Sequence, residues 1–202
     1  MTQRTIVFAG DSITDAGRRE DPDALGDGYV RLIAERLAGS GDRVVNSGIS
    51  GDRAVDLRAR WSEDVLAHDP DVLTVLIGVN DMWRRYDSDD ATSPEQFRAV
   101  YDELLGSLAG TGASIILMEP FLLSVSDGMH AWRTDDLDAK IAVVRELAAT
   151  HGATLVGLDA LLTAAAQDRG PEAVAADGVH PTPYGHGLIA DAWMAAAAPQ
   201  LA

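Results

Sequence analysis

Five short apolar segments, rich in Val, Ile and Leu and without polar alternation, recur along the chain. They span residues 6–9, 44–45, 72–77, 115–118 and 154–156. Strands of this composition are buried on both faces, which is typical of a parallel sheet covered by helices. Parallel neighbours can be joined only through crossover connections, so these segments constrain the fold more than any other feature of the sequence.

Helical patterns fill several of the intervals between these segments. Apolar residues recur at helical spacing over residues 29–37, 94–108 and 137–149. Ser93 before Pro94 predicts an N-cap followed by proline at the first helical position, and Thr182 before Pro183 repeats this signature. The alternation predicts an α/β fold, a three-layer α/β/α sandwich around a parallel sheet of about five strands.

Composition narrows the function classes. The 202 residues include 16 Lys and Arg against 32 Asp and Glu, a net charge of −16 that repels phosphate backbones and anionic headgroups, so neither nucleic acid nor a membrane surface is an expected partner. The absence of cysteine excludes disulfides and thiolate chemistry. No repeat or Pro/Gly/Ser-rich linker divides residues 1–202, so a single domain is expected.

The N-terminus gives no sign of a targeting segment. No apolar run approaches the roughly 20 residues that span a bilayer. The apolar stretch 6–9 is too short for the central region of a signal peptide and is typical of a strand instead. For the chain as given, no membrane insertion and a cytoplasmic location are therefore expected.

Polar clusters follow the first three predicted strands, and a fourth lies in the last connection before the C-terminal helix. They are Gly-Asp-Ser-Ile-Thr-Asp at 10–15, Asn-Ser-Gly-Ile-Ser-Gly-Asp at 46–52, Gly-Val-Asn-Asp at 78–81 and Asp-Gly-Val-His-Pro at 177–181. Each cluster alone is also compatible with an ordinary turn or helix cap. Because ligands of open α/β sheets bind outside the carboxyl ends of the strands, we expect all four clusters at one edge of the sheet.

The last cluster places His180 three residues after Asp177, in a segment that Pro181 biases toward an extended chain. A histidine in this setting can donate one ring N–H to the carboxylate while its other nitrogen faces the cleft, which is the orienting geometry of a catalytic triad. Ser12 would supply the hydroxyl nucleophile. The oxyanion donors would be the backbone N–H groups of Ser12 and Gly51 and the Asn80 side-chain amide.

The four clusters, in this order, resemble the consensus blocks of the SGNH (GDSL-type) hydrolase family. Residues 10–13 resemble the nucleophile block, 48–52 the glycine block, 78–81 the asparagine block and 177–181 the acid–base block. The one departure is Ile13, where the family has leucine. The resemblance covers almost the whole chain and implies a flavodoxin-like α/β/α fold, no metal, and esterase, thioesterase or carbohydrate deacylase activity.

The resemblance also implies roles for individual residues. Ser12 corresponds to the nucleophile, His180 to the general base and acid, and Asp177 to the residue that orients the histidine. Ser12, Gly51 and Asn80 correspond to the donors of the oxyanion hole.

Residues beside these clusters are candidates for substrate binding. Asp11 adjoins the nucleophile and could order the oxyanion-hole loops or cap a helix. Trp83 and Arg84 follow the asparagine block, where an aromatic ring could stack on a sugar and an arginine could bind an acidic group. The alternative is that the arginines Arg84 and Arg85 point into solvent beside an exposed aromatic ring. Phe121 and Trp132, beyond the fourth strand, form a second candidate wall.

No metal or other cofactor is expected. His180 and His186 with Asp177 are the nearest approach to a metal-ligand set, but one histidine lies in a loop and the other in a predicted helix. The two therefore do not share a helical face, and no third histidine is near in the sequence.

The connections between elements indicate the size of the acyl group. Most are short, and no amphipathic lid helix is present that could cover a lipid tail. Of the two segments able to shape a pocket, 81–93 is dominated by Asp and Arg, which gain little from added methylenes. Apolar residues in 119–134 are the counter-evidence, because folded over the cleft they could line an acyl channel.

The sequence thus predicts a metal-free serine esterase that forms an acyl-enzyme and hydrolyses a small-molecule ester, with short acyl groups on a sugar or small alcohol preferred. An acyl thioesterase or lysophospholipase is the enzymatic alternative. A small-ligand binding module on the same fold is the alternative outside enzymes. Its phosphate-binding form is disfavoured because Asp11 and Asp15 flank Ser12 and would repel phosphate.

Overall fold

The computed structural model describes residues 3–202 and has a five-stranded parallel sheet at its centre, in the order β2-β1-β3-β4-β5. The strands are β1 (Thr5–Gly10), β2 (Arg43–Gly48), β3 (Val72–Leu76), β4 (Ser114–Met118) and β5 (Thr154–Val156). All neighbouring strands pair in parallel. The parallel sheet, its five strands and the flavodoxin-like order expected from the sequence are confirmed.

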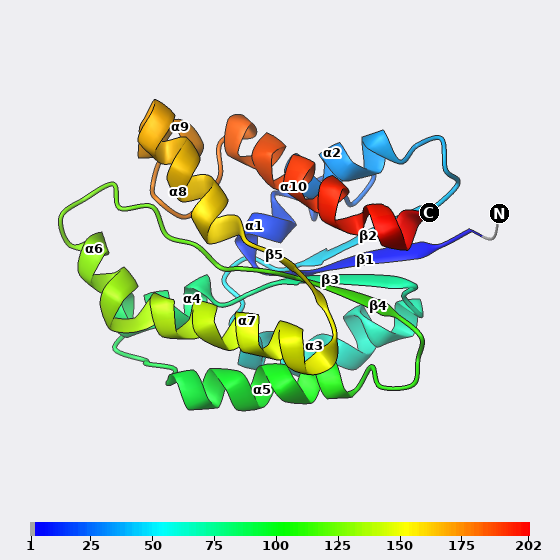
Figure 1. Ribbon diagram of the computed structural model, residues 1–202, viewed down its shortest axis with the longest axis horizontal. Coiled ribbons are helices and arrows are strands. Elements are labelled where there is room, and N and C mark those ends of the chain that lie inside the picture. The colour runs from blue at the N-terminus through cyan, green and yellow to red at the C-terminus, as the bar shows by residue number, and fades with distance from the viewer. Residues whose placement is uncertain (1–2) are drawn as a thin grey trace.

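Helices cover both faces of the sheet, as Figure 1 shows. On one face lie α2 (Tyr29–Arg36), α8 (Leu158–Arg169) and α10 (Pro183–Leu201), and on the other lie α3 (Ala54–Asp64), α5 (Pro94–Gly106) and α7 (Asp138–His151). Shorter helices are α1 (Ser12–Asp15), α4 (Val79–Asp87), α6 (Met129–Trp132), α9 (Pro171–Val174) and the 3₁₀ turn η1 (Leu66–His68). Together these layers form the predicted three-layer sandwich.

Strand β1 shows why the strands carry no polar alternation. Its residues Ile6 and Phe8 face α2 and α10, and Val7 and Ala9 face α3, α5 and α7. All four are fully buried, so each face of the strand contributes to a separate apolar core. Phe8 packs against Trp193 of α10, with the ring centroids 5.1 Å apart.

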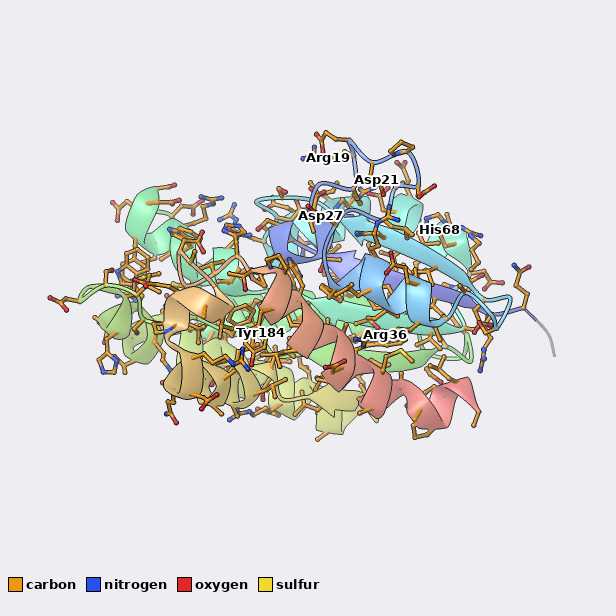
Figure 2. All side chains as sticks on the ribbon, turned by 90° about the horizontal axis from the view of Figure 1, so that it is seen from above. Arg19, Asp21, Asp27, Arg36, His68 and Tyr184 are labelled. Carbon is orange, nitrogen blue, oxygen red and sulfur yellow. The ribbon has the colours of Figure 1, made fainter. Side chains whose placement is uncertain are left out.

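The long helices begin where the sequence signatures predict. Ser93 accepts a hydrogen bond from the Gln96 backbone N–H at the start of α5, and Thr182 accepts one from Gly185 at the start of α10. On the same face as α10, α2 lies alongside it, and Arg36 of α2 pairs with Asp191 of α10 at 2.7 Å (Figure 2). Within residues 3–202 no helix has both the length and the apolar composition needed to cross a bilayer.

Two features differ from the sequence expectations. Strand β2 continues through Asn46, Ser47 and Gly48, which were expected after the strand. The buried Asn46 is accommodated because its amide donates to the carbonyls of Thr14 at 2.7 Å and Leu25 at 2.8 Å. Helices α4 and α8 were not predicted, and α4 begins inside the polar cluster 78–81, a composition also typical of loops.

A π-helical turn interrupts the long helix beyond β4. Residues 129–151 are helical throughout, but the segment η2 (Arg133–Leu137) has π rather than α geometry. Such turns insert one extra residue into a helix and occur frequently at functional sites. This one separates α6, which carries Trp132, from α7 on the face of the sheet.

The chain crosses from one face to the other between β1 and β3. After β1 the chain passes to α2 on one face, and after β3 it reaches α5 on the opposite face (Figure 1). In doubly wound sheets the carboxyl ends of two such strands border the ligand-binding crevice. The first and third polar clusters lie at these two strand ends.

Candidate active site

Ser12, His180 and Asp177 form one chain of hydrogen bonds at the carboxyl edge of the sheet. The Ser12 Oγ lies 2.8 Å from His180 Nε2, and His180 Nδ1 lies 2.6 Å from Asp177 Oδ2. The second oxygen of Asp177 accepts hydrogen bonds from the backbone N–H groups of Val179 and His180. The structure therefore brings together the three residues that the sequence singled out, although they are separated by up to 168 positions.

Ser12 is presented by a tight turn between β1 and the single-turn helix α1. The Asp11 carboxylate caps this helix by accepting a hydrogen bond from the Ile13 backbone N–H at 3.0 Å. The turn requires glycine at position 10, because a β-carbon there would lie 2.4 Å from both the Leu76 carbonyl oxygen and Thr14 Oγ1. Ser12 thus lies just beyond the end of β1.

The charge state of Asp177 fixes the orientation of the histidine. Burial alone would raise its pKa, but hydrogen bonds from the His180 ring and from two backbone N–H groups outweigh that effect and hold the pKa below its usual value. An ionised Asp177 accepts from the Nδ1–H of His180, which leaves Nε2 as the acceptor for the Ser12 hydroxyl. Both side chains are half exposed, at 48% for His180 and 49% for Asp177, so the site is open to solvent.

Three further donors come from neighbouring strand ends. Gly10 at the end of β1 pairs with Gly48 on β2 and with Leu76 on β3, so the segments that follow these strands lie together. Within residues 3–202, neither the Ser12 nor the Gly51 backbone N–H donates to a protein acceptor. The Asn80 amide donates to the Asp52 carbonyl oxygen at 3.0 Å, which fixes the side chain and leaves its second N–H available.

Gly51 has a φ of +90°, which a residue with a side chain adopts only under strain. This conformation turns the chain between Ser50 and Asp52. Ser50 donates from both its backbone N–H and its hydroxyl to the buried Asp15 carboxylate, at 2.9 and 2.8 Å. The loop that carries Gly51 is therefore held on both sides of the glycine.

Asp11 is too buried to touch a substrate, which corrects its assignment as a substrate-binding candidate. It is 1% exposed, and within residues 3–202 its carboxylate makes one hydrogen bond, the helix-capping bond described above. Its second oxygen is buried without a hydrogen-bond partner. Burial, together with the nearby charges of Asp81 and Asp52, raises the pKa of Asp11 to about 7.

The neighbouring Asp81 was not singled out in the sequence beyond its place in the asparagine block. It is fully buried, and its Oδ2 accepts a hydrogen bond from the Ala54 backbone N–H at 3.0 Å, which joins the start of α4 to the start of α3. Burial raises its pKa to about 6. Asn80 and Asp81 therefore both bind the segment that follows Gly51.

Phe121 lies in the core, so its assignment to a substrate-binding wall is wrong. Its side chain is fully buried, and Leu122 and Leu123 are buried beside it. The Leu123 backbone N–H donates to the Gly178 carbonyl at 2.9 Å, which holds this segment beneath the acid–base loop. A cavity of about 420 Å³ lies along the segment, lined by Leu122, Leu123 and residues of α8, but none of the Ser12–His180–Asp177 set lines it.

Trp83 and Trp132 do lie beside the site. The Trp83 ring is 6.2 Å from the His180 ring and 6.4 Å from the Trp132 ring, both at 45°. Trp132 stacks on Tyr86 at 4.8 Å and 12°, and the Arg85 guanidinium covers Tyr86 at 5.6 Å. We call Trp83, Tyr86 and Trp132 the aromatic cluster.

Tyr86 belongs to the run 83–86 that is expected to rim the cleft, but only Trp83 and Arg84 of that run are candidates for substrate binding. In helix α4 the spacing of three between Trp83 and Tyr86 puts both rings on the face toward α6. Arg84 projects elsewhere: a β-carbon placed on Gly51 would lie 3.6 Å from its Nη2, and it also pairs with Asp87. Residues 49–53, between β2 and α3, carry Gly51, and we call them the glycine loop. Arg84 therefore borders the glycine loop, next to the expected oxyanion donors.

His186, which was weighed as a metal ligand, has a structural role. Its Nδ1 accepts a hydrogen bond from the Tyr29 backbone N–H at 3.1 Å, and its ring stacks against the Tyr29 ring. Burial lowers the pKa of His186 to about 4, which keeps the ring neutral and able to accept that bond near neutral pH. The residue joins α10 to the start of α2.

The flavodoxin-like α/β fold and the hydrogen-bonded serine, histidine and aspartate are typical of one class of serine hydrolases. Residues 8–188 match the model of the GDSL-like Lipase/Acylhydrolase family, and the chain belongs to this family. It is accordingly a carboxylic ester hydrolase, and the resemblance found in the sequence is confirmed. A non-catalytic binding module is thereby set aside.

Individual relatives extend this comparison. The chain is 36% identical to an acetylxylan esterase from Geobacillus stearothermophilus over 94% of its own length and 91% of that protein. The crystal structure of that esterase matches with a TM-score of 0.86 at 34% identity, covering 98% of this chain and 94% of the other. An α/β hydrolase from the metagenome of Lake Arreo matches with a TM-score of 0.88 at 34% identity, covering 96% and 95%.

Crystal structures of two catalytic mutants of the Geobacillus enzyme also match, with TM-scores of 0.88 and 0.87. In one a histidine is replaced by alanine, and in the other a serine. The residues replaced in those two mutants are thus a histidine and a serine. Ser12 and His180, which are hydrogen-bonded to each other here, are of the same two types.

Proposed function

We propose that Ser12, His180 and Asp177 are the catalytic triad of a metal-independent esterase that removes short acyl groups, acetyl foremost, from the hydroxyl groups of carbohydrates. The observation that carries this proposal is the unbroken chain of hydrogen bonds from Ser12 Oγ through the His180 ring to Asp177. It supplies a nucleophile, a proton acceptor and an orienting carboxylate without further groups.

In the first half of the reaction, Ser12 Oγ attacks the ester carbonyl carbon and its proton passes to His180 Nε2. The backbone N–H groups of Ser12 and Gly51 and the Asn80 amide donate to the resulting oxyanion. Collapse of this intermediate breaks the bond to the alcohol oxygen, which takes the proton from His180. The acyl group remains on Ser12, and Asp177 stabilises the transient imidazolium throughout.

In the second half, a water molecule attacks the acyl-enzyme. His180 accepts the proton of that water and returns it to Ser12 Oγ as the second tetrahedral intermediate collapses. The carboxylic acid leaves, and the resting state is restored. The same three donors serve both intermediates, because both place the charge on the former carbonyl oxygen.

A short acyl group is supported by the position of the apolar residues. Of the residues able to line an acyl channel, Phe121, Leu122 and Leu123 are buried in the core, and Val125 and Trp132 are partly buried against it. Full burial of a methylene contributes about 0.8 kcal/mol, so an acyl site without an apolar channel gains little from longer chains. This arrangement favours a deacylase of short acyl groups over a thioesterase or lysophospholipase.

Two features support a carbohydrate as the alcohol part of the ester: the site is open to solvent, and aromatic rings lie beside it. Aromatic rings stack on the apolar faces of sugars, and Trp83 and Trp132 stand beside His180, with Arg84 bordering the glycine loop. The half-exposed histidine leaves room for a large alcohol such as an oligosaccharide. The 36% identical relative is an acetylxylan esterase, so acetylated xylo-oligosaccharides are the first substrates to test.

The test of the triad is Ser12→Ala, assayed on p-nitrophenyl acetate and acetylated xylo-oligosaccharides. Loss of the nucleophile should lower kcat by about 10⁴ to 10⁶ while the fold is retained. A fluorophosphonate should label the native protein and fail to label the variant. Ser40→Ala, which alters an exposed serine after α2, is the matched control and should keep full activity. Undiminished turnover by folded Ser12→Ala protein would refute the triad.

Two further assays test the remaining parts of the proposal. EDTA should leave turnover unchanged; loss that zinc restores would overturn metal independence. Across p-nitrophenyl esters from C2 to C12, below their micelle thresholds, kcat/KM should be highest at C2 to C4. A steady rise to C8 or beyond would instead support a thioesterase or lysophospholipase.

A further inference from the structure

Arg60 of α3 donates hydrogen bonds to the ends of two strands and to the glycine loop at once. Its Nη2 donates to the Gly10 carbonyl at 3.1 Å, and its Nη1 donates to the Ser47 carbonyl at 2.7 Å. Its Nε donates to Asp52 Oδ2 at 2.7 Å. No other arginine described in residues 3–202 bonds to all three of these segments.

Two of these contacts, at Gly10 and Asp52, lie close to a proposed oxyanion donor. Gly10 precedes Ser12 by two residues, and Asp52 directly follows Gly51. The Asp52 carbonyl in turn accepts the hydrogen bond that fixes the Asn80 amide. Counting hydrogen bonds and chain steps between residues, Gly51 and Asn80 are two links from the guanidinium group and Ser12 is three.

The setting of Arg60 favours a fixed rather than a mobile side chain. It is only 13% exposed, and its charge is balanced by Asp52 and by Asp64, which lies one helical turn further along α3. Guanidinium is planar and presents its donors at fixed angles, so it sets the relative positions of the groups that it binds. The Gly10 carbonyl also accepts a hydrogen bond from the Ile49 backbone N–H at 3.0 Å, so Arg60 and the start of the loop that carries Gly51 meet at the same acceptor.

We propose that Arg60 is a positioning residue that sets the spacing of the Ser12, Gly51 and Asn80 donors around the oxyanion. The proposal rests on the function proposed above. Arg60 itself does not touch the reacting atoms; it acts through the Gly10 and Ser47 carbonyls and through Asp52. Displacement of the donors weakens their bonds to the developing charge and leaves ground-state binding of the ester unaffected.

The first experiment compares Arg60→Met with Arg58→Met. Arg58 lies on the same helix, but its side chain pairs with Glu103 on the surface, so it controls for the change of charge and helix composition. Arg60→Met should lower kcat for p-nitrophenyl acetate by about 10²-fold, because a shift near 1 Å in a catalytic group costs that much. KM should stay within about twofold, as expected when only a transition-state interaction is lost. Arg58→Met should match the native protein.

Chemical rescue separates positioning from general stability. In Arg60→Ala, added guanidinium chloride at millimolar concentration should restore part of kcat by occupying the vacated site, whereas sodium chloride at equal ionic strength should not. Arg60→Lys, which keeps the charge and loses the fork, should fall between Met and the native residue. The guanidinium salt should not rescue Asn80→Ala, whose missing group is an amide.

A double-mutant cycle with Asn80→Ala locates the effect. If Arg60 acts through the oxyanion donors, Arg60→Met should cost clearly less in the Asn80→Ala background than in the native one. If the effects of Arg60→Met and Asn80→Ala on kcat were fully additive, Arg60 would act elsewhere and the proposal would be overturned. An unchanged kcat in folded Arg60→Met protein, or a rise in KM alone, would also overturn it. Ser12→Ala that retains turnover is a different result: it would refute the triad itself, whatever the Arg60 variants do.

Discussion

Two regions border the Ser12–His180 pair, and the chain builds them by different means. The loop from Gly51 to Ala54 is held by directional polar contacts, from Asn80 to the Asp52 carbonyl and from the Ala54 N–H to Asp81. The opposite border is the aromatic cluster, in which Trp83, Tyr86 and Trp132 pack ring against ring between α4 and α6.

The difference matches the roles proposed for the two regions. Hydrogen bonds weaken steeply with distance and angle, so a loop fixed by several of them holds its donors within a narrow range of positions. Stacked rings tolerate sliding over one another at small cost, so an aromatic border can adapt to different sugars. We therefore expect changes in the glycine loop to affect the rate of the chemical step, and changes in the aromatic cluster to affect substrate choice.

The largest expected effect that tests this contrast comes from Asn80→Ala. Removal of one of three oxyanion donors should lower kcat by about 10² to 10³, with little change in KM. Both p-nitrophenyl acetate and acetylated xylo-oligosaccharides should lose activity by the same factor, because the donor acts on the shared carbonyl. A loss confined to the oligosaccharide would assign Asn80 to substrate recognition and break the contrast.

The next effect concerns the buried Asp11 carboxyl beside the glycine loop. Its pKa is raised from 3.8 to about 7 in the folded protein, so the folded state holds a proton that the unfolded state releases. The resulting stability is fully present below about pH 4 and is lost as pH rises toward 7. Asp11→Asn keeps the helix cap and removes this titration.

The measurement is the free energy of unfolding of native and Asp11→Asn protein from pH 4 to pH 8. From pH 4 to pH 8, the free energy of unfolding of the variant should rise relative to that of the native protein by about 2–4 kcal/mol, since each pKa unit corresponds to about 1.4 kcal/mol. His186, whose pKa is lowered to about 4, works in the opposite direction in both proteins and cancels in the comparison. Parallel curves would show that Asp11 is ionised in the folded state.

The smallest effect is expected from Trp132→Ala. An aromatic contact contributes about 0.5–1.5 kcal/mol beyond simple burial, so KM for acetylated xylo-oligosaccharides should rise about two- to tenfold. The change for ethyl acetate should be smaller, because that substrate does not reach the aromatic cluster. Leu155→Ala, which trims an exposed apolar residue of β5, serves as the control. An equal loss of kcat on both substrates would mean that Trp132 supports the triad instead.

Much of the site could be predicted because its residues follow strands in a fixed order. The apolar runs located the strand ends, and the parallel arrangement brought Ser12, Gly51 and Asn80 to the same edge. The spacing of Asp177 and His180 was sufficient for their hydrogen bond, because a contact over three residues depends on local chain geometry alone.

The remaining features depend on tertiary contacts that leave little trace in the sequence. Phe121 lies just after β4, where an apolar residue could line a cleft. In the structure the hydrogen bond from the Leu123 backbone N–H to the Gly178 carbonyl holds this segment in the core. Arg60 gave no signal, since three of its acceptors lie in other segments up to 50 positions away and two of these are backbone carbonyls. Tyr86 would have been recognised had α4 been assigned as a helix.

The π turn at Arg133–Leu137 gives this architecture a means of evolving new specificity in single steps. It represents one residue more than a regular helix would hold, and each residue of an α-helix corresponds to a rotation of about 100°. Deleting that residue would turn the Met129–Trp132 turn about the helix axis and carry Trp132 away from Trp83. The sheet, the Ser12–His180–Asp177 hydrogen bonds and the loop that carries Gly51 would be untouched, so under the proposed function one deletion would change the contact with the sugar and leave catalysis in place.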